Sequence, residues 1–117
     1  MRHRPQWRRL RYAQPVFHYT TKDGWNGIRS QVVWCFRASK PPGPHPRAAY
    51  FTILDPTTPY LAAKLLIPRA KLAYSFHFGD VGDLQPLPGG RGHFIVYSPA
   101  DYPVEQGRQI AHGTTGL

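Results

Sequence analysis

Cysteine, acidic residues and long apolar runs are all scarce in this 117-residue chain. A single cysteine, Cys35, cannot form an internal disulfide, and it excludes any cysteine-rich zinc site. No apolar run comes near the roughly 20 residues that a membrane-spanning helix needs. No secretory hydrophobic segment follows the basic start of the chain. We therefore expect a soluble protein without disulfides.

The shortage of acidic residues gives the chain a strong positive charge. Six Asp and Glu face fifteen Lys and Arg, for a net charge of +9. Such a charge attracts phosphate groups of a nucleic acid, a dinucleotide or an anionic membrane surface. Residues 1–13 form a basic N-terminal extension, which we interpret as a solvated tail, a phosphate-contacting arm or an organelle-targeting remnant. Residues 14–117 have the length of one domain. The arginines of the extension are Arg2, Arg4, Arg8, Arg9 and Arg11.

Proline and glycine are plentiful and limit the length of any helix. With 13 prolines and 11 glycines, the composition disfavours a helical bundle and favours short strands joined by loops. β-Branched and aromatic runs predict strands at 14–19, 32–36, 49–53, 70–78, 93–97 and 104–111. Thr20 and Asp23 form a helix-start pattern for a short helix that reaches about Ser30. A second helix is predicted at 60–67. The prediction is an α+β fold of five or six short strands and two small helices.

Three features of this layout are candidates for chemistry. His18 ends a predicted strand just before a helix that carries Gly24, although a lone histidine in a strand is usually structural. Tyr50 and Tyr60 are ten residues apart and would together hold a flat aromatic ligand, unless both are ordinary core residues. Glu105 is the only glutamate, and its carboxylate faces either a pocket or solvent. Asp55 and Asp101 are predicted in turns.

Other kinds of site find no support in the sequence. The chain has neither a phosphate-binding Gly-x-x-x-x-Gly-Lys-Ser/Thr motif nor a dinucleotide-binding Gly-x-Gly-x-x-Gly motif. His77 and His93 have no nearby cluster at metal-ligand spacing, so we expect no metal. Cys35 beside Trp34 is predicted to be a buried residue and not a nucleophile.

The order of three segments resembles the ADP-ribosyltransferase superfamily, in particular its small toxin-type branch with a His-Tyr-Asp/Glu signature. The first segment is Phe17-His18-Tyr19-Thr20-Thr21 followed by Gly24, Gly27-Ile28 and Ser30. The second is Tyr50-Phe51-Thr52 with Pro56. The third is Pro103-Val104-Glu105-Gln106-Gly107-Arg108-Gln109-Ile110, with one residue inserted before the isoleucine. The resemblance covers roughly residues 16–112.

The resemblance implies a split, twisted β-sheet core that holds NAD as co-substrate, with no metal. It implies that His18 bonds a ribose hydroxyl and that Tyr50 and Tyr60 stack on the nicotinamide ring. Tyr19, Thr20 and Gly24 are expected to contribute to NAD binding, the last two on the adenosine side. Glu105 would bind the 2′-hydroxyl of the nicotinamide ribose and stabilise positive charge on the sugar.

The implied function is mono-ADP-ribosylation of a protein or nucleic-acid acceptor by a toxin or effector. Such a protein would act in the cytoplasm or nucleus, without membrane contact and delivered without a cleavable signal peptide. The sequence departs from many transferases at Pro103, where they carry Gln or Glu; this puts an arginine acceptor in doubt. Alternatives are an NAD hydrolase on the same fold, a transferase that removes a 2′-phosphate from RNA, and a non-enzymatic basic nucleic-acid-binding module. Removal of a 2′-phosphate would require more basic residues in the pocket than we can assign from this sequence.

Overall fold

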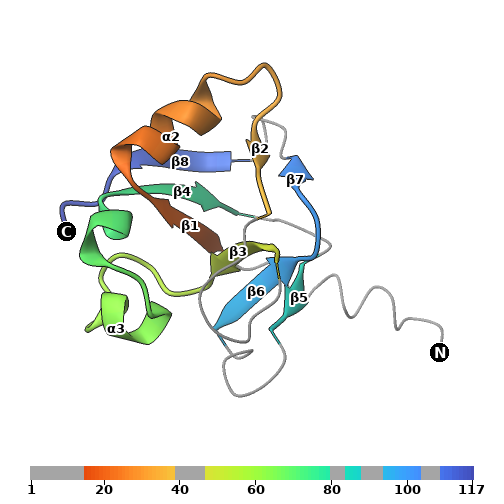
Figure 1. Cartoon of the computed structure of the whole chain (residues 1–117). Helices are drawn as coiled ribbons and strands as arrows, with labels where there is room; N and C mark the ends of the chain where they lie inside the picture. The colour runs from red at the N-terminus through yellow and green to blue at the C-terminus, as the bar shows by residue number, and fades with distance from the viewer. Residues whose placement is uncertain (1–14, 39–46, 80–83, 88–93, 104–108) are drawn as a thin grey trace, which may run out of the picture.

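Two antiparallel β-sheets of unequal size form the frame of the protein in the computed structural model (Figure 1). The structure describes residues 15–38, 47–79, 84–87, 94–103 and 109–117, with only the backbone of residues 109 and 110. The large sheet has six strands in the order β5-β6-β3-β1-β4-β8, and the small sheet pairs β2 with β7. The coarse prediction of an α+β fold is therefore confirmed. The basic extension, residues 1–13, lies outside the described residues.

The strands of the large sheet are short, and each comes from a β-rich segment of the sequence. They are β1 (Val16–Thr20), β3 (Ala49–Thr52), β4 (Tyr74–Phe78), β5 (Gln85–Pro86), β6 (Ile95–Ser98) and β8 (Gln109–Thr114). The small sheet consists of β2 (Cys35–Phe36) and β7 (Tyr102–Pro103). Cys35 on β2 is a partly buried free thiol.

Helix α2 (Lys22–Arg29) follows β1 directly, and its boundaries have clear local causes. The hydroxyl of Thr21 caps the helix by accepting the backbone N–H of Gly24 at 3.1 Å. Asp23 in the first turn and Arg29 in the last complement the helix dipole. The cap is one residue later than predicted because Thr20 still belongs to β1, where it pairs with Tyr74.

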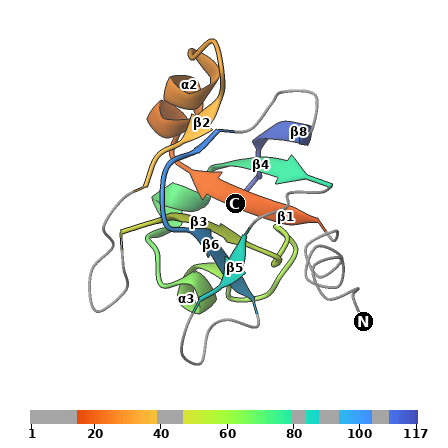
Figure 2. The ribbon, with the colours of Figure 1, turned by 90° about the vertical axis from the view of Figure 1, so that its right-hand side faces the viewer.

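Helix α3 (Leu61–Leu65) has only five residues, and a short 3₁₀ helix, η1 (Arg69–Leu72), follows it. Both residues that flank α3, Tyr60 and Leu66, adopt the left-handed conformation, with φ of 57° and 58°. This conformation cannot continue a right-handed helix, so α3 is shorter than the predicted 60–67. Helix α2 lies on one side of the large sheet and α3 on the other (Figure 2).

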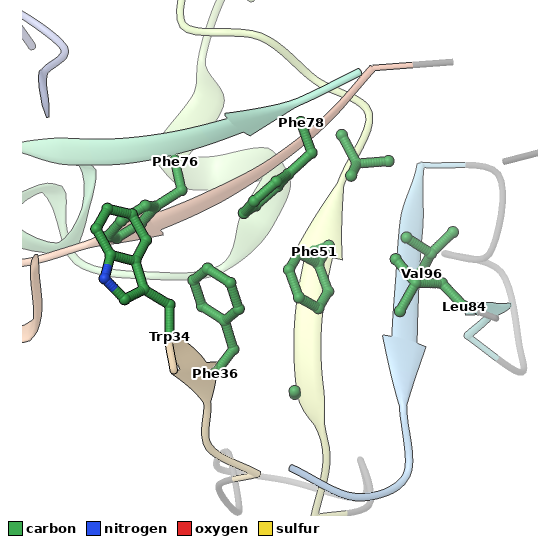
Figure 3. Close-up of a cluster of buried hydrophobic side chains, with 9 residues drawn as sticks. Trp34, Phe36, Phe51, Phe76, Phe78, Leu84 and Val96 are labelled. Carbon is green, nitrogen blue, oxygen red and sulfur yellow. The ribbon is translucent and has the colours of Figure 1, made fainter. Parts of the chain in front are cut away.

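The hydrophobic core lies between the two sheets and is mostly aromatic. Phe36 of β2 is 1% exposed, and its ring meets Phe51, Phe76 and Phe78 edge to face at 5.3–5.5 Å between centroids. Figure 3 shows Phe36 among these rings, with Trp34 beside Phe76. Edge-to-face packing of this kind adds stability beyond simple area burial. These contacts hold the small sheet against one face of the large sheet, which we call the inner face.

Two of the predicted strands are wrong in part. Only Cys35–Phe36 of the predicted 32–36 strand is extended and paired, while Val32 is 96% exposed and Val33 58% exposed. The predicted 70–78 strand begins at Tyr74, because residues before it form η1, with the N–H of Lys71 bonded to the carbonyl of Pro68 at 3.0 Å. The two strand predictions are therefore confirmed only for Cys35–Phe36 and Tyr74–Phe78.

Candidate functional site

The site begins at a split in the large sheet, between strands β1 and β3. β1 pairs with β4 along all five of its residues, from Val16 to Thr20. With β3 it pairs only at Phe17 and Thr52. Figure 1 shows the two strands close at one end and running apart toward the other. A gap in the hydrogen-bond ladder leaves backbone groups available for other partners.

The side chain of His18 spans this split. Its Nδ1 lies 3.0 Å from the carbonyl oxygen of Tyr50, 32 residues away in the sequence. A carbonyl only accepts hydrogen bonds, so Nδ1 must carry the proton and Nε2 must carry the lone pair. The structure thus brings together the first two residues of the signature, through a side chain on β1 and the backbone of β3.

The surroundings of His18 keep its ring neutral. The ring packs against Phe36 at 4.6 Å, Phe51 at 5.5 Å and Phe76 at 6.4 Å between centroids. Burial lowers the pKa of His18 from 6.5 to about 4, although the hydrogen bond to Tyr50 opposes this shift. The structural interpretation of His18 as a core residue is therefore partly correct, but the ring also offers Nε2 as a fixed hydrogen-bond acceptor.

The ring of Tyr50 lies on the opposite face of the sheet from Phe51, since side chains alternate along a strand. It stacks beside Tyr97, its partner on β6, with 6.2 Å between centroids. The pKa of the Tyr50 hydroxyl is raised, mainly by burial and to a smaller extent by the nearby Tyr97. Tyr50 therefore contributes its carbonyl to the split and its ring to the outer face, where outer means the face away from the small sheet.

Tyr60 has the geometry of a residue available to a ligand. The residue is 83% exposed, and its backbone is held in the left-handed region that residues other than glycine rarely adopt. The interpretation of Tyr60 as a core aromatic is wrong, because a core ring is buried. Tyr19, in contrast, is fixed, with its hydroxyl donating to the carbonyl of Leu54 at 2.8 Å.

Gly24 is explained by the close approach of Thr20. A Cβ at position 24 would lie 2.0 Å from the Thr20 hydroxyl oxygen and 3.3 Å from its Cβ. At Gly27, in the same helix, a Cβ would meet nothing within 4 Å. Gly24 thus lets the start of α2 fold back against the end of β1, next to His18.

These two glycines form a matched pair for a stability test. Gly27→Ala should stabilise the protein by up to about 1 kcal/mol, because alanine favours a helix. Gly24→Ala gains the same term but must displace Thr20, at a cost on the order of 1–3 kcal/mol. Urea unfolding should place Gly24→Ala below Gly27→Ala by that cost, and Thr20→Ala, which removes the hydroxyl but keeps the Cβ, should remove most of the difference. Equal stability of the two glycine variants would show that Thr20 does not restrict Gly24.

Glu105, the third residue of the signature, lies outside the described residues. On either side of it, Pro103 ends β7 opposite Cys35, and Gln109 begins β8 opposite Phe78. Asp101 follows a bend at residues 99–100, and its carboxylate accepts the backbone N–H of Ala38, 63 residues away in the sequence, at 2.7 Å. Asp55 also serves a turn and accepts hydrogen bonds from Thr57.

Comparisons with models of known protein families, with curated proteins and with solved structures find no match for this chain. Among the described residues, no three His, Cys, Asp or Glu side chains are grouped as metal ligands. No helix in the described part of the chain has the length and apolar character to cross a membrane.

Proposed function

We propose that the protein is an NAD-dependent mono-ADP-ribosyltransferase whose co-substrate binds at the split between β1 and β3. The observation that carries the proposal is the contact between His18 Nδ1 and the Tyr50 carbonyl. Both residues belong to the segments that resemble the family, and a resemblance in sequence alone does not require that they meet. Their meeting at a split in the sheet supports the implied ADP-ribosyltransferase-like fold.

His18 has the protonation state that ribose binding requires. Because Nδ1 is committed as a donor to Tyr50, Nε2 is left as an acceptor for a hydroxyl group. A ribose hydroxyl would donate to it. The low pKa of His18 keeps this acceptor available throughout the neutral range.

The reaction breaks the bond between nicotinamide and C1′ of the ribose. The bonding electron pair leaves with nicotinamide, which departs as a neutral molecule. An acceptor nucleophile then bonds to C1′ and releases its proton to solvent or a base. Positive charge builds on the sugar in the transition state, and the Glu105 carboxylate would stabilise it. The ring of Tyr50 lies beside Tyr97 on the face of the sheet opposite the His18 ring, so the expected stacking of Tyr50 on the nicotinamide does not fit this geometry. Stacking on Tyr60 would orient the leaving ring.

The acceptor remains a protein side chain, a nucleic acid or water. If water is the acceptor, the protein is an NAD hydrolase with the same first step. A basic nucleic-acid-binding module is the alternative outside enzymes, and the net charge of +9 favours it. The two classes differ in one observable: a transferase or hydrolase releases nicotinamide from NAD, and a binding module does not.

NAD binding is tested by thermal unfolding of the free protein with increasing NAD. A ligand that binds only the folded state raises the melting temperature in proportion to the logarithm of its concentration above Kd. The expected result is a rise at millimolar NAD. No rise, with a cooperative unfolding transition showing that the protein is folded, would count against NAD as co-substrate.

Tyr60 and Leu66 provide the matched variants for this assay. Both flank α3 in the same left-handed conformation, and they are 83% and 67% exposed. Tyr60→Ala should weaken NAD binding about fivefold, the loss of roughly 1 kcal/mol of stacking, while leaving the free protein as stable as before. Leu66→Ala should change neither property. Equal NAD affinity in both variants would remove Tyr60 from the site.

A further inference from the structure

One edge of the large sheet has no partner strand among the described residues. Strand β8 is the last in the order β5-β6-β3-β1-β4-β8, and its register with β4 is regular from Ala111 to Thr114. At the opposite edge, β5 has only two residues, one of them Pro86, which lacks an N–H group. β8 has six residues, and none of them is proline, lysine, arginine or an acid. Of the two edges, only β5 has features that protect a sheet against pairing with a further strand.

The backbone of β8 points hydrogen-bonding groups out of this edge. The N–H of Thr115 donates to the carbonyl of Ala73 at 2.9 Å, in register with the ladder between β8 and β4. Backbone groups along a strand point alternately to its two sides. Gly113 therefore also bonds toward β4, whereas the N–H and C=O groups of His112 and Thr114 point away from the sheet. Both of these residues are exposed, so an added strand can form hydrogen bonds with their backbone.

A hollow of about 410 Å³ lies beside this edge, on the outer face of the large sheet. Residues 111–114 of β8 line one side of it, and the turn after β3 lines another. Phe76 points from β4 into the core, so its neighbours on β4 and their partners on β8, Ala111 and Gly113, point outward. A Cβ at position 113 would meet nothing within 4 Å. The outward positions of β8 are small, and they leave room for a side chain that comes from beyond the edge.

The charge in the hollow is opposite in sign to that of the whole chain. Among the residues that line it, Asp55 is the only one of the Asp, Glu, Lys and Arg types. Its Oδ1 accepts the N–H and the hydroxyl of Thr57 at 3.0 and 2.6 Å. The Thr57 hydroxyl is the main cause of a lowered pKa, so the exposed carboxylate is ionised at neutral pH. In a chain of net charge +9, this hollow favours a cationic side chain.

We propose that the free edge of β8 binds an extended segment of a partner protein as a further strand, and that the hollow receives a lysine or arginine of that segment. The backbone of His112 and Thr114 supplies hydrogen bonds that any extended sequence can use, and the hollow selects among side chains. Every second residue of the added strand faces the outer side. Only a long side chain can cross Ala111 and Gly113 toward Asp55, and its charge must be positive.

This edge is separate from the proposed NAD site. Strands β1 and β4 lie between β8 and the split where β1 and β3 run apart. The ring of His18 packs against Phe36 and Phe51 in the core, whereas the hollow opens on the other face of the sheet. Peptide binding at β8 therefore does not depend on transferase activity.

The test is an NMR titration of the full-length protein with the capped peptide Thr-Val-Arg-Val-Thr, followed by hydrogen exchange of the backbone amides. In the free protein the amides of His112 and Thr114 should exchange rapidly, because they point out of the sheet, and those of Ala111 and Gly113 slowly. The peptide should protect His112 and Thr114. This alternation is specific to strand addition, because a ligand held by side chains alone would not produce it. The same peptide with methylated backbone nitrogens should not bind.

The choice of side chain is tested by replacing the central arginine of the peptide with glutamate. The wild-type protein should bind the arginine peptide about threefold more tightly, the effect of one exposed ion pair. The net charge of +9 alone would favour the glutamate peptide, so a preference for arginine reports the hollow. Asp55→Asn should remove the preference and keep the alternating protection. Asp101→Asn makes the same change of charge away from the hollow and should keep the preference.

The peptide series alone can overturn the proposal, even if Asp55→Asn fails to fold. The outcomes against it are no binding of the arginine peptide, binding without protection of His112 and Thr114, or a preference for the glutamate peptide. Protection of the same two amides in the free protein would also overturn it. Protection that disappears on dilution would assign the edge to a second copy of this chain, and protection that persists would assign it to another segment of the same chain.

Discussion

Glu105→Gln should reduce nicotinamide release from NAD by about a hundredfold or more while leaving NAD affinity nearly unchanged. The amide has the size of the carboxylate and can still bond a ribose hydroxyl, so the ground-state complex should persist. It lacks the negative charge that an oxocarbenium-like transition state requires. Losing one such electrostatic group typically costs about 10²–10³ in rate. The loss should therefore appear in kcat and not in KM.

Asp101→Asn is the control for this experiment. The amide oxygen of an asparagine can still accept the Ala38 N–H, so this contact between the two segments should survive. Its nicotinamide release should match that of the wild-type protein. If Asp101→Asn released no nicotinamide while Glu105→Gln kept normal release, Glu105 would not be the third residue of the signature.

Acid should destabilise the protein through His18, by up to about 3 kcal/mol between pH 6.5 and pH 4. The pKa of His18 is about 4 in the folded protein and near 6.5 in the unfolded chain. In that interval the unfolded chain binds a proton that the folded protein does not. The free energy of unfolding is therefore highest above pH 6.5 and falls as the pH is lowered toward 4.

His18→Asn isolates this contribution from all other titrating groups. The asparagine amide can still donate to the Tyr50 carbonyl, but it does not titrate. Urea unfolding at pH 7 and pH 4.5 should show a smaller loss of stability in the variant than in the wild-type protein, by about 2–3 kcal/mol. An equal loss in both would show that the His18 ring takes up a proton freely in the folded state.

Local signals in the sequence were sufficient for helix α2 and for the extended strands of the large sheet. The helix-start pattern, which lies one residue before the observed Thr21 cap, and the β-branched and aromatic strand residues act over a few positions, so they can be recognised in the sequence. The register between β1 and β4 and the order of the strands could not be predicted from the sequence, because both depend on contacts between segments far apart in the chain.

Where the prediction of elements failed, tertiary context decided the outcome. Val32 and Val33 have strong strand propensity, but both are exposed, and neither pairs with a strand among the described residues. Residues 70–72 read as part of a strand, yet Leu72 is buried from a 3₁₀ turn that Pro68 starts. Propensity was a weak guide at both places.

The candidate site could be predicted as a set of residues but not as an arrangement. The His18, Tyr50 and Tyr60 positions came from sequence order, whereas the hydrogen bond across the split and the left-handed backbone of Tyr60 came from the structure.

Cleavage of the nicotinamide–ribose bond of NAD is measured as nicotinamide release from NAD labelled in the nicotinamide ring, by the purified protein with and without cell extract and beside Glu105→Gln. We expect the wild-type protein to release nicotinamide, faster with extract if the extract supplies a macromolecular acceptor, and Glu105→Gln to release almost none. Folded wild-type protein that releases no nicotinamide under either condition, or equal release by Glu105→Gln, would overturn the proposed function.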